Sequence, residues 1–285
     1  MAIRDQSYTA YDGPMRENAA WAVIGWTGLR TYWRFWRTKL VLFAVWLVPF
    51  VYALVIIGEY ALTTQLGGSP IDQTDPGPIS GYLRVQVFSM ALIFIANGCG
   101  VISEDLRHRT IQLYFSKPIS RLDYALGKYL TLLWLTFFGV LLPTLMLGAL
   151  RTAFYFQSDN LGEVALVHLK AGGLAVFIFA TMAAIVIGLS SLTRRTGYAV
   201  LAWIGVLLVP MILQAIVAVA SDGSPLAGLL SFPGVVDLAT QAAIGGRDAL
   251  AEEVPIWAPA AVLLTLFSLG LGALGWRVSR LEGIT

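Results

Sequence analysis

Residues 257–276 read WAPAAVLLTLFSLGLGALGW, an uncharged stretch with a tryptophan at each end. The two tryptophans stand 19 positions apart. A helix rises about 1.5 Å per residue, so a helix here would separate the two indole rings by about 28 Å. The hydrocarbon core of a bilayer is about 30 Å thick, and tryptophan favours its two interfaces. The stretch therefore predicts a membrane-spanning helix with Trp257 and Trp276 at opposite membrane surfaces.

Further stretches of the chain have the same apolar character and length. Across the 285 residues, 57% are hydrophobic and only 13% are charged, about half the charged share of an ordinary soluble domain. The sequence therefore predicts an all-α integral membrane protein, with six transmembrane helices forming one domain over residues 1–285. The other five expected spans are 40–62, 82–103, 129–150, 172–192 and 198–220.

The basic residues predict how these spans are oriented. Fifteen of the 19 Lys and Arg residues precede the first span, follow the sixth, or lie between spans two and three or four and five. Because cations concentrate on the cytoplasmic side, we expect both termini in the cytoplasm. Residues 221–255 carry five acidic side chains and are interrupted by Pro233-Gly234. We expect them to form an external segment with short broken or re-entrant helices.

Composition excludes several classes of protein. One cysteine, Cys99, cannot form an internal disulfide, and His108 and His168 are too far apart in sequence to indicate a metal cluster. The net charge of +2 argues against a nucleic-acid partner. The first 20 residues carry five charges and no apolar run, so we expect no cleavable signal peptide.

Residues 18–38 have a different pattern, which predicts an amphipathic helix at the membrane interface. At about 100° per residue, Trp21 and the aromatic and aliphatic residues that follow it occupy one half of a helix. Arg30, Arg34 and Arg37 cluster on the opposite side. Such a helix is typical of one lying in the headgroup layer, with its arginines on lipid phosphates. The alternative is a helix packed against a cytosolic partner.

The segment between spans two and three reads SEDLRHRTIQLYFSKPISR, residues 103–121. Ser103 followed by two acids favours the start of a helix, because acids stabilise its N-terminal end. Pro118 would end that helix, and Ser120 can cap the next one. The pattern predicts a short cytoplasmic helix held tangential to the membrane between two spans. This shape suits an element that transmits force from a soluble motor.

The same segment resembles the permease subunits of type-2 ABC exporters, a class that includes the permease of nitrous-oxide-reductase maturation systems. Arg109 departs from the family pattern, which usually has glycine there. The six spans, the preceding amphipathic helix and the stretch at 230–233 fit the family more weakly. The matching residues are Glu104, Thr110, Ser116, Pro118, Ser120, Arg121, Gly127 and Lys128.

The resemblance implies a division of labour between subunits. Two copies of the permease, or two related permeases, dock on a dimer of ABC ATPase subunits in a bacterial or archaeal cell membrane. ATP and Mg bind the ATPase, so this chain is expected to be neither an enzyme nor a cofactor-binding protein. Its Gly127-Lys128 pair is not a P-loop, because the first glycine of that motif is replaced by Leu122.

Two sets of site residues follow. With 104–121 as the coupling segment, the expected ATPase-coupling residues are Glu104, Asp105, Arg107, Arg109, Thr110, Leu113, Ser116, Pro118 and Arg121. The expected membrane-interface residues are Trp21, Arg30, Arg34, Arg37, Trp257 and Trp276.

Three other functions compete with an exporter permease. A membrane anchor for a cytosolic complex would use the same surface helices but transport nothing. An ion-coupled secondary transporter usually has ionisable groups near the membrane midplane, whereas Glu59 and Arg84 lie near the outer ends of their spans. A membrane-embedded enzyme needs a catalytic constellation, which the spans lack. The transported substrate is not identified by the sequence.

Overall fold

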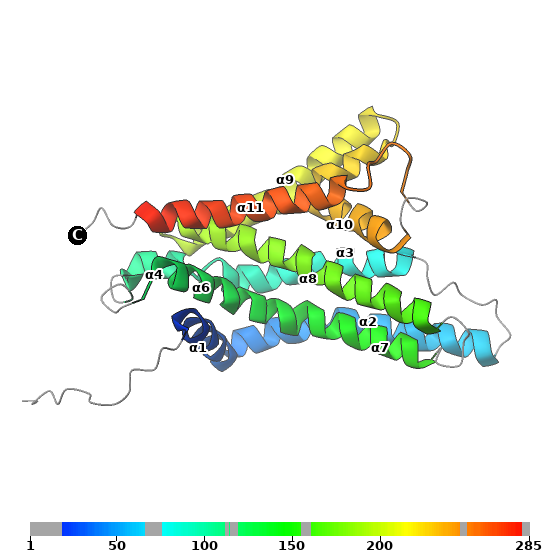
Figure 1. Ribbon diagram of the computed structural model, residues 1–285, viewed down its shortest axis with the longest axis horizontal. Coiled ribbons are helices and arrows are strands. Elements are labelled where there is room, and N and C mark those ends of the chain that lie inside the picture. The colour runs from blue at the N-terminus through cyan, green and yellow to red at the C-terminus, as the bar shows by residue number, and fades with distance from the viewer. Residues whose placement is uncertain are drawn as a thin grey trace, which may run out of the picture.

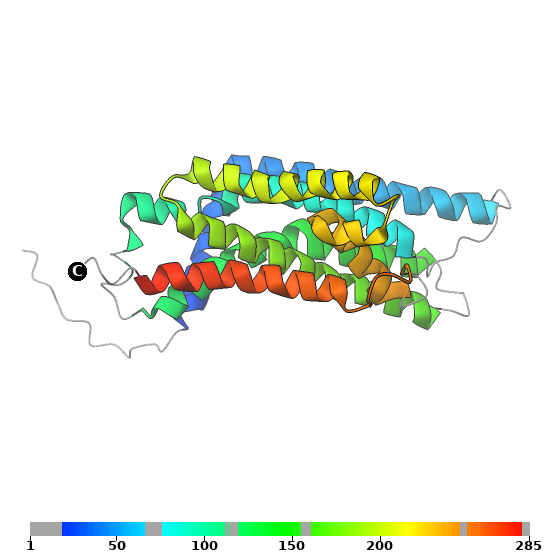
Figure 2. The same ribbon diagram turned by 90° about the horizontal axis from the view of Figure 1, so that it is seen from above.

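The computed structural model describes residues 19–65, 76–111, 114, 119–154, 161–245 and 250–280. Every regular element in these ranges is a helix. Figure 1 shows most of the helices running along the longest axis of one elongated bundle. Helix α1 (Ala20–Arg34) instead lies across one end of the bundle, as Figure 2 shows. We call this the α4 end, and the opposite one the α10 end.

Six helical segments within the described ranges are long and apolar enough to cross a membrane, which confirms the predicted number of spans. The second and third spans are each built from several helical pieces, whereas the others are single helices. The spans are, in order, α2 (Trp36–Gln65); α3 (Pro76–Ile93), η1 (Phe94–Gly98) and α4 (Ser103–His108); α6 (Arg121–Thr136), η2 (Phe137–Leu141) and α7 (Leu142–Phe154); α8 (Leu161–Leu192); α9 (Thr196–Ala220); and α11 (Ala258–Ser279).

Two π-helical turns, η1 and η2, interrupt the second and third spans. Side chains from other parts of the bundle bond to their carbonyl groups. The Trp46 indole donates to the Phe138 carbonyl at 3.0 Å, and the Gln86 amide donates to the Gly139 carbonyl at 2.8 Å. Backbone groups in a membrane need such partners because lipid offers none. The π turns are therefore points where neighbouring spans hold each other by polar contacts.

Helix α8 is at the centre of the bundle and packs most extensively against α11. Small residues bring these two helices close together: a Cβ atom added at Gly188 would lie only 2.6 Å from the Gly270 carbonyl oxygen. Close backbone approach through small residues is a common basis of helix packing in membranes. By contrast, α2 and α9 leave most of their apolar stretches exposed, and α9 leans away from the bundle toward the α10 end (Figure 1).

Three short helical pieces follow α9 at the α10 end: η3 (Pro225–Leu230), α10 (Phe232–Thr240) and η4 (Gln241–Gly245). The Ser231 hydroxyl caps α10 by accepting a hydrogen bond from the Gly234 amide at 3.1 Å. Asp237 of α10 is bonded to Ser80 and forms an ion pair with Arg84 at 3.8 Å. These contacts hold the segment against the start of α3.

Candidate functional site

The short helix α4 ends at His108 because the backbone of Arg109 turns left-handed, with φ of 58°. The Thr110 amide then bonds back to the Asp105 carbonyl at 3.1 Å. The helix that begins at Ser103 therefore stops well before Pro118, where the sequence analysis placed its end. Helical backbone occurs again at Ile111 and Tyr114.

Four side chains that join the second span to the third form what we call the Asp105 clasp: Asp105, Thr110, Tyr124 and Lys128. One carboxylate oxygen of Asp105 is 2.6 Å from the Lys128 ammonium and accepts a hydrogen bond from the Tyr124 hydroxyl at 2.7 Å. The other oxygen accepts from the Thr110 hydroxyl at 2.9 Å. The clasp therefore fixes the end of α4 and the turn after it to the first two turns of α6.

Aromatic rings shield the charged pair of the clasp. The Lys128 ammonium lies 5.5 Å from the ring centroid of Tyr114 and 5.7 Å from that of Tyr124. The two rings meet edge to face, 5.1 Å apart. Only 15% of the Lys128 side chain and 16% of the Asp105 side chain are exposed. The Coulomb attraction within an ion pair is stronger when the pair is withdrawn from water, and removing one partner leaves an uncompensated charge.

The start of α6 is fixed locally. The Ser120 hydroxyl accepts from the Asp123 amide at 3.0 Å, and the Asp123 carboxylate accepts from the Ser120 amide at 3.3 Å. This is a capping box, so the prediction that Ser120 caps this helix is confirmed. The clasp residues Tyr124 and Lys128 follow in the first two turns of the helix.

A serine of α8 anchors the other side of α4. The Ser190 hydroxyl accepts from the amides of Ile102 and Ser103, both at 3.1 Å, and donates to the Cys99 carbonyl at 2.8 Å. Ser103 does not cap α4, because its hydroxyl donates to the Cys99 carbonyl and lies 3.1 Å from the Thr196 hydroxyl. The α4 segment is thus tied to α6, α8 and α9.

Polar contacts also tie α1 to the second span. The Tyr32 hydroxyl donates to the Asn97 backbone carbonyl of η1 at 2.9 Å, and the Thr38 hydroxyl donates to the Asn97 side-chain oxygen at 2.7 Å. Burial, reinforced by the nearby carboxylates of Glu104 and Asp105, raises the pKa of the Tyr32 hydroxyl. Tyr32 therefore stays protonated and keeps this hydrogen bond.

Glycines pack α1 directly on α6. A Cβ atom at Gly127 would lie 2.6 Å from Ile24, and one at Gly28 would collide with the Thr131 side chain. Thr131 also donates to the Gly25 carbonyl at 3.4 Å. The sequence analysis missed this packing on the chain's own third span. The spacing of Gly25 and Gly28 was the available signal, because small residues three or four apart mark close helix contacts.

The expected coupling residues separate into three groups. Glu104, Arg107 and Arg109 are exposed on α4 and its terminal turn, and Arg121 is partly exposed at the start of α6. Asp105 and Thr110 are drawn into the clasp instead of pointing outward. Leu113, Ser116 and Pro118 lie outside the described residues.

The expected interface residues are all exposed. Trp257 and Trp276 stand at opposite ends of α11, and the Arg280 guanidinium lies 4.4 Å from the Trp276 ring centroid. Trp21, Arg30 and Arg34 lie on α1, and Arg37 follows in the first turn of α2.

Among the residues that the structure describes, no three or more His, Cys, Asp or Glu side chains form a group that could hold a metal ion. The polar residues that sequence reasoning overlooked are amides, Asn97 and Gln86, buried inside apolar spans. Polar side chains inside membrane helices commonly bond across helices, so their presence in expected spans was a usable signal.

Six apolar helices, with charged residues gathered at helix ends, define a multi-pass membrane protein of the kind that serves as a permease. The sequence model of the family described as "ABC-2 family transporter protein" matches residues 29–268. The chain therefore belongs to the ABC-2 family of transporter proteins. Such a permease is a membrane component, typically not itself catalytic, and the family implies an ABC ATPase subunit as its partner. A comparison with curated proteins gave no match.

Proposed function

We propose that the chain is the permease subunit of an ABC exporter, in which ATP hydrolysis on a separate ATPase dimer drives substrate across a bacterial or archaeal cell membrane. ATP and Mg bind the ATPase. The narrower resemblance to permeases of nitrous-oxide-reductase maturation systems belongs to the same proposal. The α4 end of the bundle faces the cytoplasm with both termini, which the distribution of Lys and Arg supports.

The Asp105 clasp is the observation that carries this proposal. Segment 104–121 acts as the coupling element: the ATPase touches exposed groups such as Glu104, Arg107 and Arg109, and its movement displaces α4. Because Asp105 holds α4 to α6 and Ser190 holds it to α8, the displacement reaches three spans together. A segment that hung free between two spans would absorb the movement instead.

Helix α1 serves in this proposal as the amphipathic helix at the cytoplasmic membrane interface. It lies across the spans, as an interfacial helix must, and exposes Trp21, Trp26 and Trp33 together with two arginines. Its links to Asn97 and to α6 connect this interface helix to the spans on either side of the coupling element.

A second permease copy, or a related permease, completes the transporter. Helices α2 and α9 leave most of their apolar stretches exposed, which supports a partner within the membrane along these two spans. Cysteine cross-linking between copies, at exposed positions of α2 and α9, tests this part of the proposal.

Purification from the native membrane in mild detergent, followed by mass spectrometry and an ATPase assay, tests the central claim. We expect a stoichiometric P-loop ATPase in the preparation. Asp105→Asn should weaken the ion pair and reduce the effect of the permease on the ATPase rate. Asp222→Asn is the matched control, because Asp222 is exposed at the α10 end and asparagine also tolerates its left-handed backbone. A clean preparation without an ATPase would instead favour a membrane anchor or an ion-coupled transporter.

A further inference from the structure

An open groove of about 840 Å³ lies in the elbow between α1 and α2. Helix α1 ends at Arg34 and α2 begins at Trp36, and the extended backbone of Phe35 between them makes this elbow. The π turn η2 contributes Phe138 to its wall. The groove falls within the range of about 300–1,000 Å³ that is usual for small-ligand sites.

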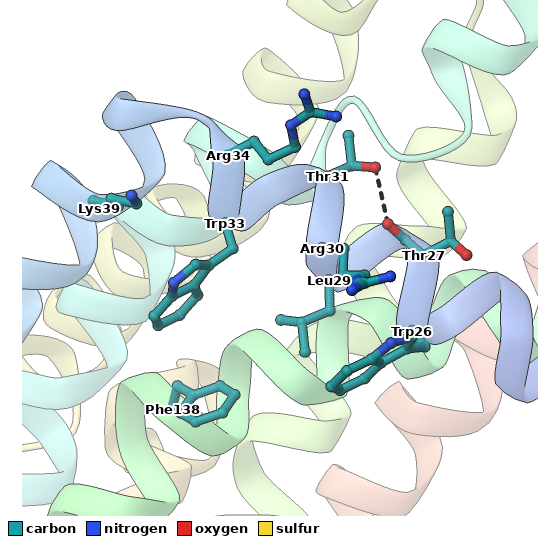
Figure 3. A pocket seen from close by; sticks show the side chains of 9 residues that line it. All are labelled: Trp26, Thr27, Leu29, Arg30, Thr31, Trp33, Arg34, Lys39 and Phe138. Atoms are coloured by element: carbon teal, nitrogen blue, oxygen red, sulfur yellow. Dashed lines mark hydrogen bonds between the residues drawn. The ribbon is translucent and has the colours of Figure 1, made fainter.

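One side of the groove is aromatic. Figure 3 shows the rings of Trp26, Trp33 and Phe138 on the same side of α1 as Leu29. The Trp33 and Phe138 rings are 5.6 Å apart, and Trp26 meets Trp134 of α6 edge to face at 6.3 Å. Trp26 and Trp33 nevertheless remain 52% and 45% exposed. Two large rings are thus held in place but left uncovered, as a binding surface for an apolar chain requires.

The remaining side is cationic. Arg30, Arg34 and Lys39 line the groove, and Figure 3 shows the Arg34 guanidinium directed away from the rings. Within the described part of the chain, no carboxylate lies within ion-pair distance of any of these three. Arginine forks and lysine ammonium groups are the usual ligands of phosphate. The groove therefore combines an uncompensated positive edge with an apolar wall.

We propose that this groove binds one anionic phospholipid. Its headgroup phosphate lies on Arg30, Arg34 and Lys39, and its acyl chains lie along Trp26, Trp33 and Phe138. An inorganic phosphate would use the cations but leave the aromatic wall bare, and a neutral lipid would leave the cations unpaired. The two chemistries of the groove match only a molecule that carries both. The proposal depends on the membrane location of the chain and not on the direction of transport.

The position of the groove gives the lipid a structural role. Helix α1 reaches the second span through Tyr32 and the third through its glycines, and Phe138 belongs to η2. A lipid in the groove therefore contacts α1, the start of α2 and the third span at once. It stabilises the folded elbow by RT ln(1 + [L]/Kd), as any ligand of the folded state does.

Native mass spectrometry of the full-length protein, released from nanodiscs of phosphatidylcholine doped with phosphatidylglycerol, tests the proposal. We expect one phosphatidylglycerol on the wild type and binding weaker by about tenfold or more in Arg30→Gln/Arg34→Gln, since each basic group near an anionic lipid contributes substantially. Arg194→Gln/Arg195→Gln is the matched control. It removes two exposed arginines that do not line the groove, and should bind like the wild type.

A second variant tests whether the lipid occupies the groove, without changing charge. Thr27 lines the groove, and the described contacts of this residue use its backbone carbonyl, so Thr27→Trp should fill the space and also expel the lipid. Equal phosphatidylglycerol on the wild type and both variants would overturn the proposal. So would displacement of the lipid by inorganic phosphate, which would mean an ion site, or equal retention of phosphatidylcholine, which would mean that the cations do not select the headgroup.

Discussion

Polar contacts hold the helices together at each end of the bundle, and these contacts are shorter at one end than at the other. At the α4 end, the Lys128 ammonium is 2.6 Å from Asp105, and two hydroxyl groups complete the carboxylate's partners. At the α10 end, the ion pairs are longer: Arg151 to Glu59 is 3.4 Å and Arg84 to Asp237 is 3.8 Å. The short contacts lie where a force would enter in our proposal, and the longer pairs lie at the opposite end of the bundle.

The largest effect is expected from Lys128→Met. This variant leaves the Asp105 carboxylate without its cation in a site mostly withdrawn from water, and should cost about 2–3 kcal/mol of stability. It should also abolish the effect of the permease on the ATPase rate. Thermal unfolding in detergent and the ATPase assay measure the two effects. Lys170→Met removes an exposed lysine of α8 and is the control. A fully coupled Lys128→Met complex would contradict the role of the clasp.

At the α10 end, Arg151→Met should separate stability from coupling. The Arg151 side chain is 5% exposed and its loss strands the Glu59 carboxylate, so we expect a cost of about 2 kcal/mol. The ATPase response should nevertheless survive, because no part of the clasp is touched. If Arg151→Met uncouples the complex as strongly as Lys128→Met, the contrast between the two ends is wrong.

A smaller change, of opposite sign, is expected from Arg109→Gly. The left-handed backbone of Arg109 costs a residue with a side chain about 1–2 kcal/mol, and glycine avoids that cost but adds backbone entropy to the unfolded chain. The net gain should be about 0.5–1 kcal/mol, measured as a higher midpoint of thermal unfolding. Arg107→Gly, inside α4, should instead destabilise by about 1 kcal/mol. If both variants changed the stability in the same direction, the left-handed backbone at Arg109 would not be the cause of the change.

The smallest effect belongs to the Arg84–Asp237 pair. Because 54% of the Arg84 side chain is exposed and the distance is 3.8 Å, Arg84→Gln should change stability by less than about 0.5 kcal/mol. Added salt should likewise have little effect on the difference in stability between Arg84→Gln and the wild type. A loss above 2 kcal/mol would mean that the Arg84–Asp237 pair holds its helices as tightly as the Asp105 clasp does.

The spans and the Ser120 cap could be predicted because their signals are local. A run of about 20 apolar residues defines a membrane helix wherever it occurs, and a capping box needs only two residues three apart. The clasp is different, since Asp105 and Lys128 belong to different helices. The bond from Tyr32 to Asn97 joins still more distant parts of the chain. Nothing in the sequence around these residues specifies their partners.

Two further features had no usable signal in this chain's own residues. Left-handed backbone is expected at glycine, and Arg109 adopts it because α4 must turn back toward α6. The π turns likewise occur in ordinary apolar sequence, FIANG at 94–98 and FFGVL at 137–141. The bundle around them decides their form, since side chains of other helices take up their carbonyl groups.

The π turns also matter for how the family can change over evolutionary time. Each π turn accommodates one residue more than an α-helical turn, so deleting a single residue there would convert it to regular helix. The wider turn absorbs the extra residue, so the helix beyond it would keep nearly the same rotational phase, whereas a deletion in regular helix would rotate everything beyond it by about 100°. A deletion in η1 would therefore leave Asp105 facing Lys128, and one in α3 would swing Asp105 away from it. We therefore expect single-residue deletions in the second and third spans to be tolerated at the π turns and not in the regular helix beside them.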